Sequence, residues 1–462
     1  MMLTLAASEM LAKVNTLWPE IVLLGTAFVV MIAGLSPRLT VRRATAGLTG
    51  FALVVAAALV VFGDAFGLPS AGPMVQFIKL AVCLVGLLLL FVAVELPDEF
   101  DSEAGRDVVF DPANVSRGEF YGFFLLSLIG VMLTAGADDL IWLFLALELT
   151  SLPTYVMVAL SRDRLEAPEA GVKYFFLGSL SAAVFLYGFA LIYGATGTTE
   201  FGAIRDALAT GVSPLALAGF VLALVGVSFK IAAVPMHFYT ADVYQGAATP
   251  VTAFLAFVPK TAGFAALILL LGLVGWPLDQ TAPVLLWTVW VLAMVTQFFG
   301  NTLALLQHNV KRVLAYSSIA HSGYMMVGLV AGPGLSAEQP IFLRNGVGAI
   351  LFYLVAYGVM NLGAFAVLGV LKRRGEEAET FDDLKGLVRR APGLAVVMAV
   401  CVFGLAGMPP LIGFWGKLYL IGAAVSAGHI VLAVLLVIAS AIAAVYYLRI
   451  VAACFLAEPV EG

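Results

Sequence analysis

The sequence is poor in charge, in cysteine and in long polar stretches. Only 11% of its 462 residues are charged, whereas 62% are hydrophobic. A soluble domain carries about 25% charged residues, so this composition excludes one. The three cysteines lie far apart, without a CxxC pair or a Cys/His cluster, and no metal site is expected. Phosphate-binding and nucleophile motifs are also missing, so neither a bound cofactor nor a bound nucleic acid is expected.

What fills the chain instead is a succession of apolar runs, each long enough to cross a bilayer core of about 30 Å. The runs are continuously apolar and do not alternate, which predicts helices rather than the strands of a membrane barrel. The fold class is therefore an all-α polytopic membrane protein. Thirteen spans are predicted, at 18–35, 44–62, 74–96, 119–135, 139–160, 170–193, 215–234, 247–274, 284–306, 313–330, 341–371, 392–420 and 430–455.

The basic residues give these spans a direction. Fifteen of the 24 Lys and Arg, Lys311 among them, fall in loops on one side of the predicted topology, and three fall on the other side. Loops rich in Lys and Arg stay in the cytoplasm. The N-terminus is therefore predicted to be periplasmic and the C-terminus cytoplasmic.

Two of the spans are interrupted by proline. Pro235 follows Lys230 in one of them, and Pro409 and Pro410 precede Lys417 in the other. Proline removes a backbone donor and clashes with the preceding turn. The carbonyls that it frees need protein or water as partners. Broken helices in two separate parts of a chain are typical of transporters built from inverted repeats.

Five ionisable side chains lie at membrane depth, namely Glu148, Lys173, Lys230, Lys260 and Lys417. Each costs about 2.5–3.5 kcal/mol even on lenient insertion scales, so such residues are functional candidates. A buried lysine tends to lose its proton and a nearby carboxylate opposes that loss. A Glu148–Lys230 pair could therefore couple proton binding to the movement of a neighbouring charge.

Each of these charges also has a simpler interpretation. Glu148 and Lys230 could form a structural ion pair between helices. Lys230 could extend toward the cytoplasmic face, as could Lys173, which lies about one turn from the end of its span. Lys79 lies near the start of its span and is expected to reach water in this way. Glu20 lies near a span end, where water is also reachable.

Two histidines are candidates for a proton relay because histidine titrates near neutral pH. His237 follows the Pro235 break, and His321 is flanked by serines and tyrosines in VLAYSSIAHSGYMMVG. The alternative for either histidine is an ordinary hydrogen bond to a neighbouring helix.

Four segments resemble a known family. The chain is similar to the antiporter-like membrane subunits of proton-pumping NADH:quinone oxidoreductase, respiratory complex I, and among them to the N-type subunit. The resemblance covers most of the chain from Arg117 onward, and DVYQGAATPVTAFLAFVPK favours the N-type over the M- and L-types. The segments are RGEFYGFFLLSLIGVMLTAGADDLIWLFLALELTSLPTYVMVAL, VPMHFYTADVYQGAATPVTAFLAFVPKTAGFAAL, NVKRVLAYSSIAHSGYMMVG and GMPPLIGFWGKLYL.

The resemblance implies a role for each matched residue. Glu148 and Lys230 correspond to the family's charged pair, Lys173 to its sixth-helix lysine, Lys260 to its central lysine and Lys417 to the lysine of its broken twelfth helix. The family also implies two inverted five-helix repeats, helices 4–8 and 9–13, each with a broken helix. Residues 1–117 would form an N-terminal segment of three helices plus the acidic loop at 97–118. Residues 118–275 would form the first repeat and residues 276–462 the second. Family members usually have fourteen helices, whereas thirteen are predicted here.

The implied activity is proton translocation as a non-redox subunit of NADH:quinone oxidoreductase in a bacterial inner membrane. NADH, FMN, iron–sulfur clusters and quinone are expected in partner subunits and no cofactor in this chain. The expected partners are lipid, an M-type antiporter-like subunit on one side and a small K-type subunit on the other. The alternatives are a subunit of a multisubunit cation/proton antiporter and an assembly scaffold with structural ion pairs.

Overall fold

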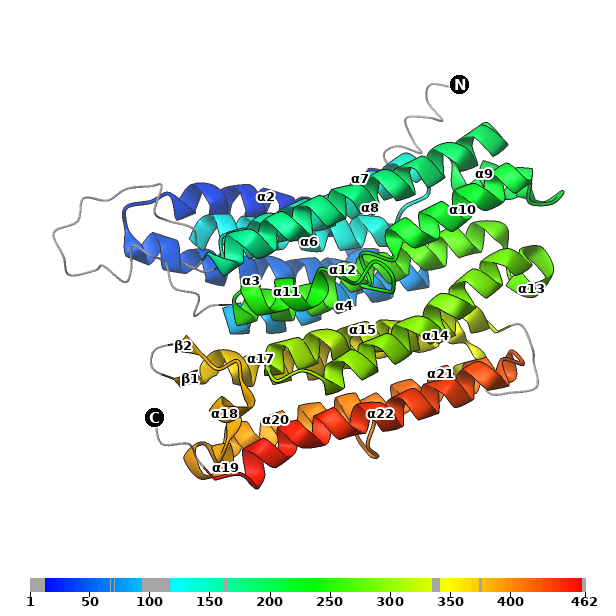
Figure 1. Ribbon diagram of the computed structural model, residues 1–462. Helices are drawn as coiled ribbons and strands as arrows, with labels where there is room; N and C mark the ends of the chain where they lie inside the picture. The colour runs from blue at the N-terminus through cyan, green and yellow to red at the C-terminus, as the bar shows by residue number, and fades with distance from the viewer. Residues whose placement is uncertain are drawn as a thin grey trace.

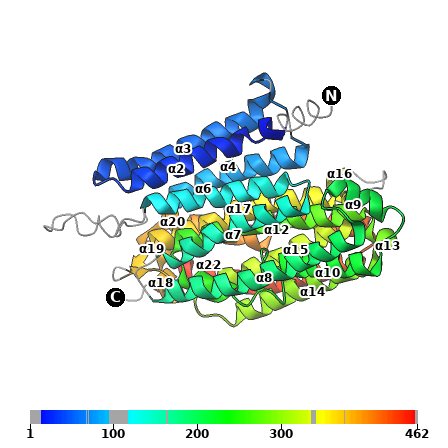
Figure 2. The same cartoon turned by 90° about the horizontal axis from the view of Figure 1, so that it is seen from above.

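The fold is a bundle of long helices that run in alternating directions between two ends (Figure 1). A computed structural model describes residues 13–66, 68–69, 71–93, 117–161, 165–334, 341–373 and 376–458. Most of the predicted acidic loop lies outside these residues. One end carries a small hairpin of β1 and β2 and is called the hairpin end here. The opposite end carries α9, α13 and α16 and is called the α13 end (Figure 2).

Ten of the described helices are long and apolar enough to cross a membrane. Four shorter apolar helices lie among them: α2 is the first, α10 continues through a break into α11, and α20 continues through a break into α21. The prediction of an all-α polytopic membrane protein is thus confirmed, whereas the count of thirteen spans stays a prediction. The spanning helices are α2 (Trp18–Gly34), α3 (Leu39–Phe62), α4 (Pro73–Ala93), α6 (Arg117–Ala135), α7 (Leu140–Ala159), α8 (Glu166–Thr196), α10 (Pro214–Val227), α11 (Thr240–Gly246), α12 (Thr249–Val274), α14 (Pro283–Leu305), α15 (Val310–Ala331), α17 (Gly346–Val370), α20 (Pro392–Ala406), α21 (Ile412–Ser426) and α22 (Ile430–Phe455).

Short elements cap the two ends of the bundle. The strands form a two-residue antiparallel pairing, with Lys372 opposite Glu377. The short elements are η1 (Gly63–Phe66), α9 (Phe201–Leu208), α13 (Leu278–Thr281), α16 (Ile341–Arg344), β1 (Lys372–Arg373), β2 (Glu376–Glu377), α18 (Phe381–Leu384) and α19 (Leu387–Arg390).

The first three helices form a layer along one side of the bundle (Figure 2). Helix α2 packs against α3 and α6, and α4 packs against α6, α12 and α17. The helices α12 and α15 form the centre of the bundle, because nearly all residues of their most apolar stretch are buried. In α3 and α8 only about a third of the corresponding residues are buried. Lys260 and His321 lie on these two central helices. The three-part division of the chain stays a prediction.

Both broken helices end in the same way. At the end of α10 the Ala233 amide donates to the Ser228 carbonyl and the Ala232 amide to that of Phe229. Ala232 has a φ of 55°, so this is a Schellman motif in which alanine takes the position that usually holds glycine. Pro235 follows three residues after Ala232.

At the end of α20 the same two bonds run from Met408 to Phe403 and from Gly407 to Gly404, with Gly407 at a φ of 88°. Pro409 and Pro410 come next. The two breaks therefore share one local geometry.

The first break starts earlier than the predicted span 215–234 implied. Helix α10 ends at Val227, so Lys230 lies within the break and not in a helix before it. The Schellman motif ends α10 before the chain reaches Pro235. The position of the proline alone therefore predicted an end of the helix that is too late in the sequence.

Candidate proton-transfer site

Glu148 and Lys230 meet within the span of α7. The Lys230 ammonium donates to Glu148 Oε1 at 3.0 Å and to Ser151 Oγ at 2.5 Å. Ser151 follows Glu148 by three residues, so both partners stand on one face of α7. The Lys230 side chain is 1% exposed and the Glu148 side chain 18%, so the carboxylate is the outer member of this pair.

Lys260 lies on α12 and is buried. Its ammonium donates to Ser322 Oγ at 2.7 Å and to the Ser318 carbonyl, both on α15. In the described part of the chain no carboxylate forms an ion pair with Lys260, in contrast to Lys230. A lysine held by neutral oxygens alone is easier to deprotonate than one beside a carboxylate.

A single hydroxyl connects Lys260 to the first break. Ser322 Oγ accepts from Lys260 and donates to the Ile231 carbonyl at 2.5 Å, and Ile231 directly follows Lys230. The close approach depends on Gly263, where a Cβ would lie 2.5 Å from Ile231 Cγ2 and 3.0 Å from Lys230 Cβ. A shift of the break at Lys230 would therefore reach Lys260 directly.

His321 lies between Lys260 and Lys417, separated from each by one aromatic ring. The Lys260 ammonium is 5.2 Å from the centre of the Tyr357 ring, which is 5.0 Å from the His321 ring. On the other side, the Tyr324 ring is 5.3 Å from His321 and 4.8 Å from the Lys417 ammonium. The structure thus gives the order Lys260, His321, Lys417.

Both ring nitrogens of His321 have hydroxyl partners. Nδ1 lies 2.8 Å from the hydroxyl of Tyr353, and Nε2 lies 2.9 Å from that of Tyr447, which also contacts Ser317 Oγ. One nitrogen of a neutral imidazole donates and the other accepts, so a hydroxyl on each side suits either tautomer. Such a histidine can receive a proton at one nitrogen and release one from the other.

Lys417 lies on α21 directly beside the second break. It is buried, and its ammonium donates to the Ala406 carbonyl at 2.9 Å. Ala406 is the last residue of α20, so its carbonyl has no partner within that helix. The lysine thus satisfies a carbonyl that the break leaves free, as expected for the neighbourhood of Pro409 and Pro410.

The two other candidates lie apart from this line. Lys173 is at the hairpin end, 47% exposed, and pairs with Glu169 at 2.8 Å and with Asp242 at 3.6 Å, which agrees with the simpler interpretation. His237 follows the first break and packs against the exposed ring of Phe238 at 4.7 Å. The structure does not bring either residue into contact with Lys260 or Lys417, and their relay roles stay predictions.

One buried pair escaped the sequence analysis. Lys79 was expected to reach water, yet it is buried on α4, 2.7 Å from the equally buried Glu20 of α2, and it donates to the Thr16 carbonyl at 2.9 Å. The prediction for both residues was wrong because the two helices start at the same end, where the two side chains pair with each other and are buried. The missed signal was the opposite charges at matching depth in spans one and three.

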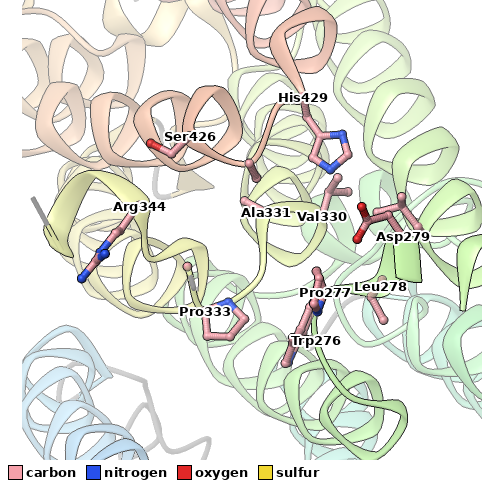
Figure 3. A pocket seen from close by; sticks show the side chains of 13 residues that line it. Trp276, Pro277, Leu278, Asp279, Val330, Ala331, Pro333, Arg344, Ser426 and His429 are labelled. Atoms are coloured by element: carbon pink, nitrogen blue, oxygen red, sulfur yellow. The ribbon is translucent and has the colours of Figure 1, made fainter. Parts of the chain in front are cut away.

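A pocket opens at the α13 end of the bundle (Figure 3). Its volume is about 190 Å3, and its lining includes Trp276, Asp279, Arg344 and His429. Asp279 and His429 lie near each other on one side of the pocket, and Arg344 lies on the other. These residues belong to short segments between spans, and the sequence analysis gave them no role.

Comparison with known proteins places the chain in a family. The sequence pattern described as "NADH:quinone oxidoreductase/Mrp antiporter, TM" matches residues 137–443. An NADH-quinone oxidoreductase subunit N of Trichlorobacter lovleyi is 40% identical over 447 residues, 95% of this chain and 87% of the relative. A subunit N of Granulibacter bethesdensis is 38% identical over 457 residues, 96% of this chain and 90% of the relative.

Solved structures agree with the sequence matches. A chain of respiratory complex I from Thermus thermophilus matches with a TM-score of 0.75 and 33% identity, over 96% of this chain and 91% of that chain. A chain of the Mrp complex from Dietzia matches with a TM-score of 0.77 over 97% of this chain and 81% of that chain, but at 24% identity it shares the fold alone. The chain therefore belongs to the NADH:quinone oxidoreductase/Mrp antiporter family of membrane subunits, in which its sequence relatives are N subunits of NADH-quinone oxidoreductases.

Proposed function

We propose that this chain is the proton-translocating N subunit of an NADH:quinone oxidoreductase, and that protons cross it through Glu148, Lys230, Lys260, His321 and Lys417. The observation that carries the proposal is the line of Lys260, Tyr357, His321, Tyr324 and Lys417, whose successive rings and ammonium groups lie 4.8–5.3 Å apart. These gaps suit transfer through hydroxyls and intervening water.

The first break supplies the coupling in this mechanism. With Glu148 charged and 3.0 Å away, the Lys230 ammonium is held toward α7. A change of charge near Glu148 alters that attraction and moves the segment that carries Ile231, whose carbonyl binds Ser322. The hydrogen bond between Ser322 and the Lys260 ammonium changes as a result. When that bond weakens, the proton of the Lys260 ammonium passes toward His321. Moving one charge against 100 mV costs about 2.3 kcal/mol, which the change at Glu148 must supply.

The exposure of Glu148 supports a partner subunit at this place. Its side chain opens to the face of α7 on which the side chains of Ile141, Leu145 and Leu152 are exposed. A carboxylate facing hydrocarbon is costly, so in this proposal another subunit covers the face. The K-type and M-type subunits are the proposed neighbours on the two sides of the chain.

The redox chemistry is assigned to other subunits in this proposal. NADH, FMN, iron–sulfur clusters and quinone would be bound there, and this chain would contribute proton transfer without a redox centre. The proposed location is the bacterial inner membrane, with the N-terminus periplasmic, so the hairpin end faces the cytoplasm. The distribution of Lys and Arg among the loops supports this direction.

The test compares pumping with electron transfer in membranes that carry Lys230→Ala or Glu148→Ala. We expect assembled complex with much less proton pumping per NADH oxidised. Asp138→Ala is the matched control, because Asp138 pairs with Lys13 at 2.8 Å on the exposed surface. Normal pumping by fully assembled variants would refute the relay. Loss of the complex on a native gel would instead support the scaffold alternative.

The alternative function is that of a subunit in a multisubunit cation/proton antiporter. The structural likeness to the Mrp complex is its support, and that likeness shows the fold alone. A strain that lacks this chain would separate the two functions. Loss of growth at high sodium with normal NADH oxidation would favour the antiporter.

A further inference from the structure

Lys311 is a buried lysine that the proposed path does not include. The sequence analysis placed it in a cytoplasmic loop, which was wrong: it is in the first turn of α15 and its side chain is 0% exposed. Its ammonium donates to the Ala247 carbonyl at 2.7 Å. It also lies 3.7 Å from both Glu377 and Glu379, in the segment at the β1–β2 hairpin. Two carboxylates at equal distance give the ammonium a choice of counter-ion.

The two carboxylates face different surroundings. Glu379 lines a pocket of about 270 Å3 at the hairpin end, which is large enough for several waters. The same pocket is lined by Glu166, Glu169, Asp242 and Lys173, so carboxylates outnumber the one cation in its lining and favour the entry of protons. Lys173 pairs with Glu169 and Asp242, and Asp242 also pairs with Arg312.

Glu377 points to the other side. It accepts from the Thr249 amide at 3.1 Å and from the Thr249 hydroxyl, at the start of α12, the helix that carries Lys260. Lys311 is therefore placed between a pocket lined mostly by carboxylates and the central helices.

One face of α15 leads from Lys311 to Lys260. Ser318 and Ser322 follow Lys311 by seven and eleven residues, so all three side chains lie within about 40° of one another around the helix. The distance along the axis from Lys311 to Ser322 is about 16 Å. Tyr244 adds a hydroxyl 3.2 Å from Ser318 Oγ. The Lys260 ammonium already donates to Ser322 Oγ and to the Ser318 carbonyl.

We propose that Lys311 is the proton-uptake lysine of this chain, loaded from the pocket through Glu379 and discharging toward Lys260. This inference rests on the proposed function. Glu379 first takes a proton from the pocket, which removes one of the two negative charges that hold the proton on Lys311. The Lys311 ammonium then releases its proton, which reaches the neutral Lys260 amine through the Ser318 and Ser322 face and its waters, and the proton on Glu379 passes to the Lys311 amine and restores the ammonium. No electron moves, and Glu377 holds the ammonium in place between the two steps.

The simpler interpretation is that Lys311 only fastens the hairpin to the bundle. Lys311→Arg separates the two, because a guanidinium keeps the positive charge and the ion pairs but does not release its proton in a protein. We expect the variant to assemble and to oxidise NADH, with proton pumping lowered about tenfold or more, since only the relay needs deprotonation. Lys385→Arg is the matched control, because Lys385 is at the same end in an exposed pair with Asp382.

Wild-type pumping by the Lys311→Arg complex would overturn the proposal. If that variant does not assemble, Glu379→Gln replaces it, and the proposal then requires slower pumping with normal assembly. Normal pumping in Glu379→Gln would overturn it as well. Failure of this inference stays distinct from failure of the proposed function: Lys230→Ala would still lower pumping in the first case and would not in the second.

Discussion

The Ser322 hydroxyl donates to the Ile231 carbonyl at 2.5 Å and ties the central helix α15 to the break in the seventh span. Through this contact the segment that carries Lys230 and the ammonium of Lys260 share one polar atom. The proposed mechanism needs such a contact, because two buried cations in direct contact would repel each other.

Ser322→Ala tests this contact. Loss of the hydroxyl leaves the Lys260 ammonium with one acceptor fewer and frees the Ile231 carbonyl, at a cost of about 1–3 kcal/mol for each buried polar group left unpaired. We expect assembled complex with a lower ratio of protons pumped to NADH oxidised, measured in sealed membrane vesicles. Thr288→Ala is the control, because the Thr288 hydroxyl is exposed and bonds within its own helix. An unchanged ratio in Ser322→Ala would show that the contact carries no coupling.

Gly263→Ala tests the close approach of α12 to the first break. The added methyl would meet Ile231 and Lys230 below ordinary contact distances, and overpacking of this kind costs about 1–3 kcal/mol. We expect a lower thermal stability of the purified complex together with reduced pumping. Gly272→Ala is a matched control on the same helix, where nothing lies within 4 Å of the new Cβ. Equal behaviour of the two variants would contradict this prediction.

The Glu20–Lys79 pair predicts a particular pattern of stability. Removing one partner leaves a buried charge, at a cost of about 3–5 kcal/mol, whereas replacing both by neutral groups is often close to neutral. We expect Glu20→Gln and Lys79→Met each to reduce the amount of assembled complex on a native gel, and the double variant to recover it. The exposed pair of Lys13 and Asp138 should contribute less than about 1 kcal/mol and show no such pattern. A double variant as unstable as the single variants would argue against the ion pair.

His429 predicts a dependence of stability on pH at the α13 end. Burial holds the pKa of His429 below its usual value, and Asp279 opposes this shift only in part. The unfolded chain therefore binds the proton first as the pH falls below about 6.5, and stability is lost in that range. The measurement is the apparent unfolding temperature of the complex at about pH 7.5 and at about pH 5.5. We expect this temperature to fall less between the two pH values in His429→Gln than in the wild type. An identical fall in both would sink the assignment to His429.

The sequence predicted the spans well because bilayer thickness imposes a length that composition reveals. It also found Glu148, Lys230, Lys260 and Lys417, because a charge in an apolar run is conspicuous. The partners were not predictable, since Ser151 and Ser322 look like any serine in a membrane helix. The predictions for Lys79 and Lys311 were wrong for a related reason. Their exposure was predicted from their distance to the end of one span, whereas burial depends on the neighbouring segments that pack against that position.

The matching ends of α10 and α20 have an electrostatic consequence. The two half-helices run in opposite directions and both stop inside the protein (Figure 1). The C-terminus of a helix carries a partial negative charge of roughly half an electron, worth about 0.3–1 kcal/mol to a nearby cation and more where water is excluded. Lys230 and Lys417 each lie at such a terminus. The backbone thereby supplies negative potential at two points inside the bundle, and because that potential does not titrate, it would stay constant through each proton transfer of the proposed mechanism.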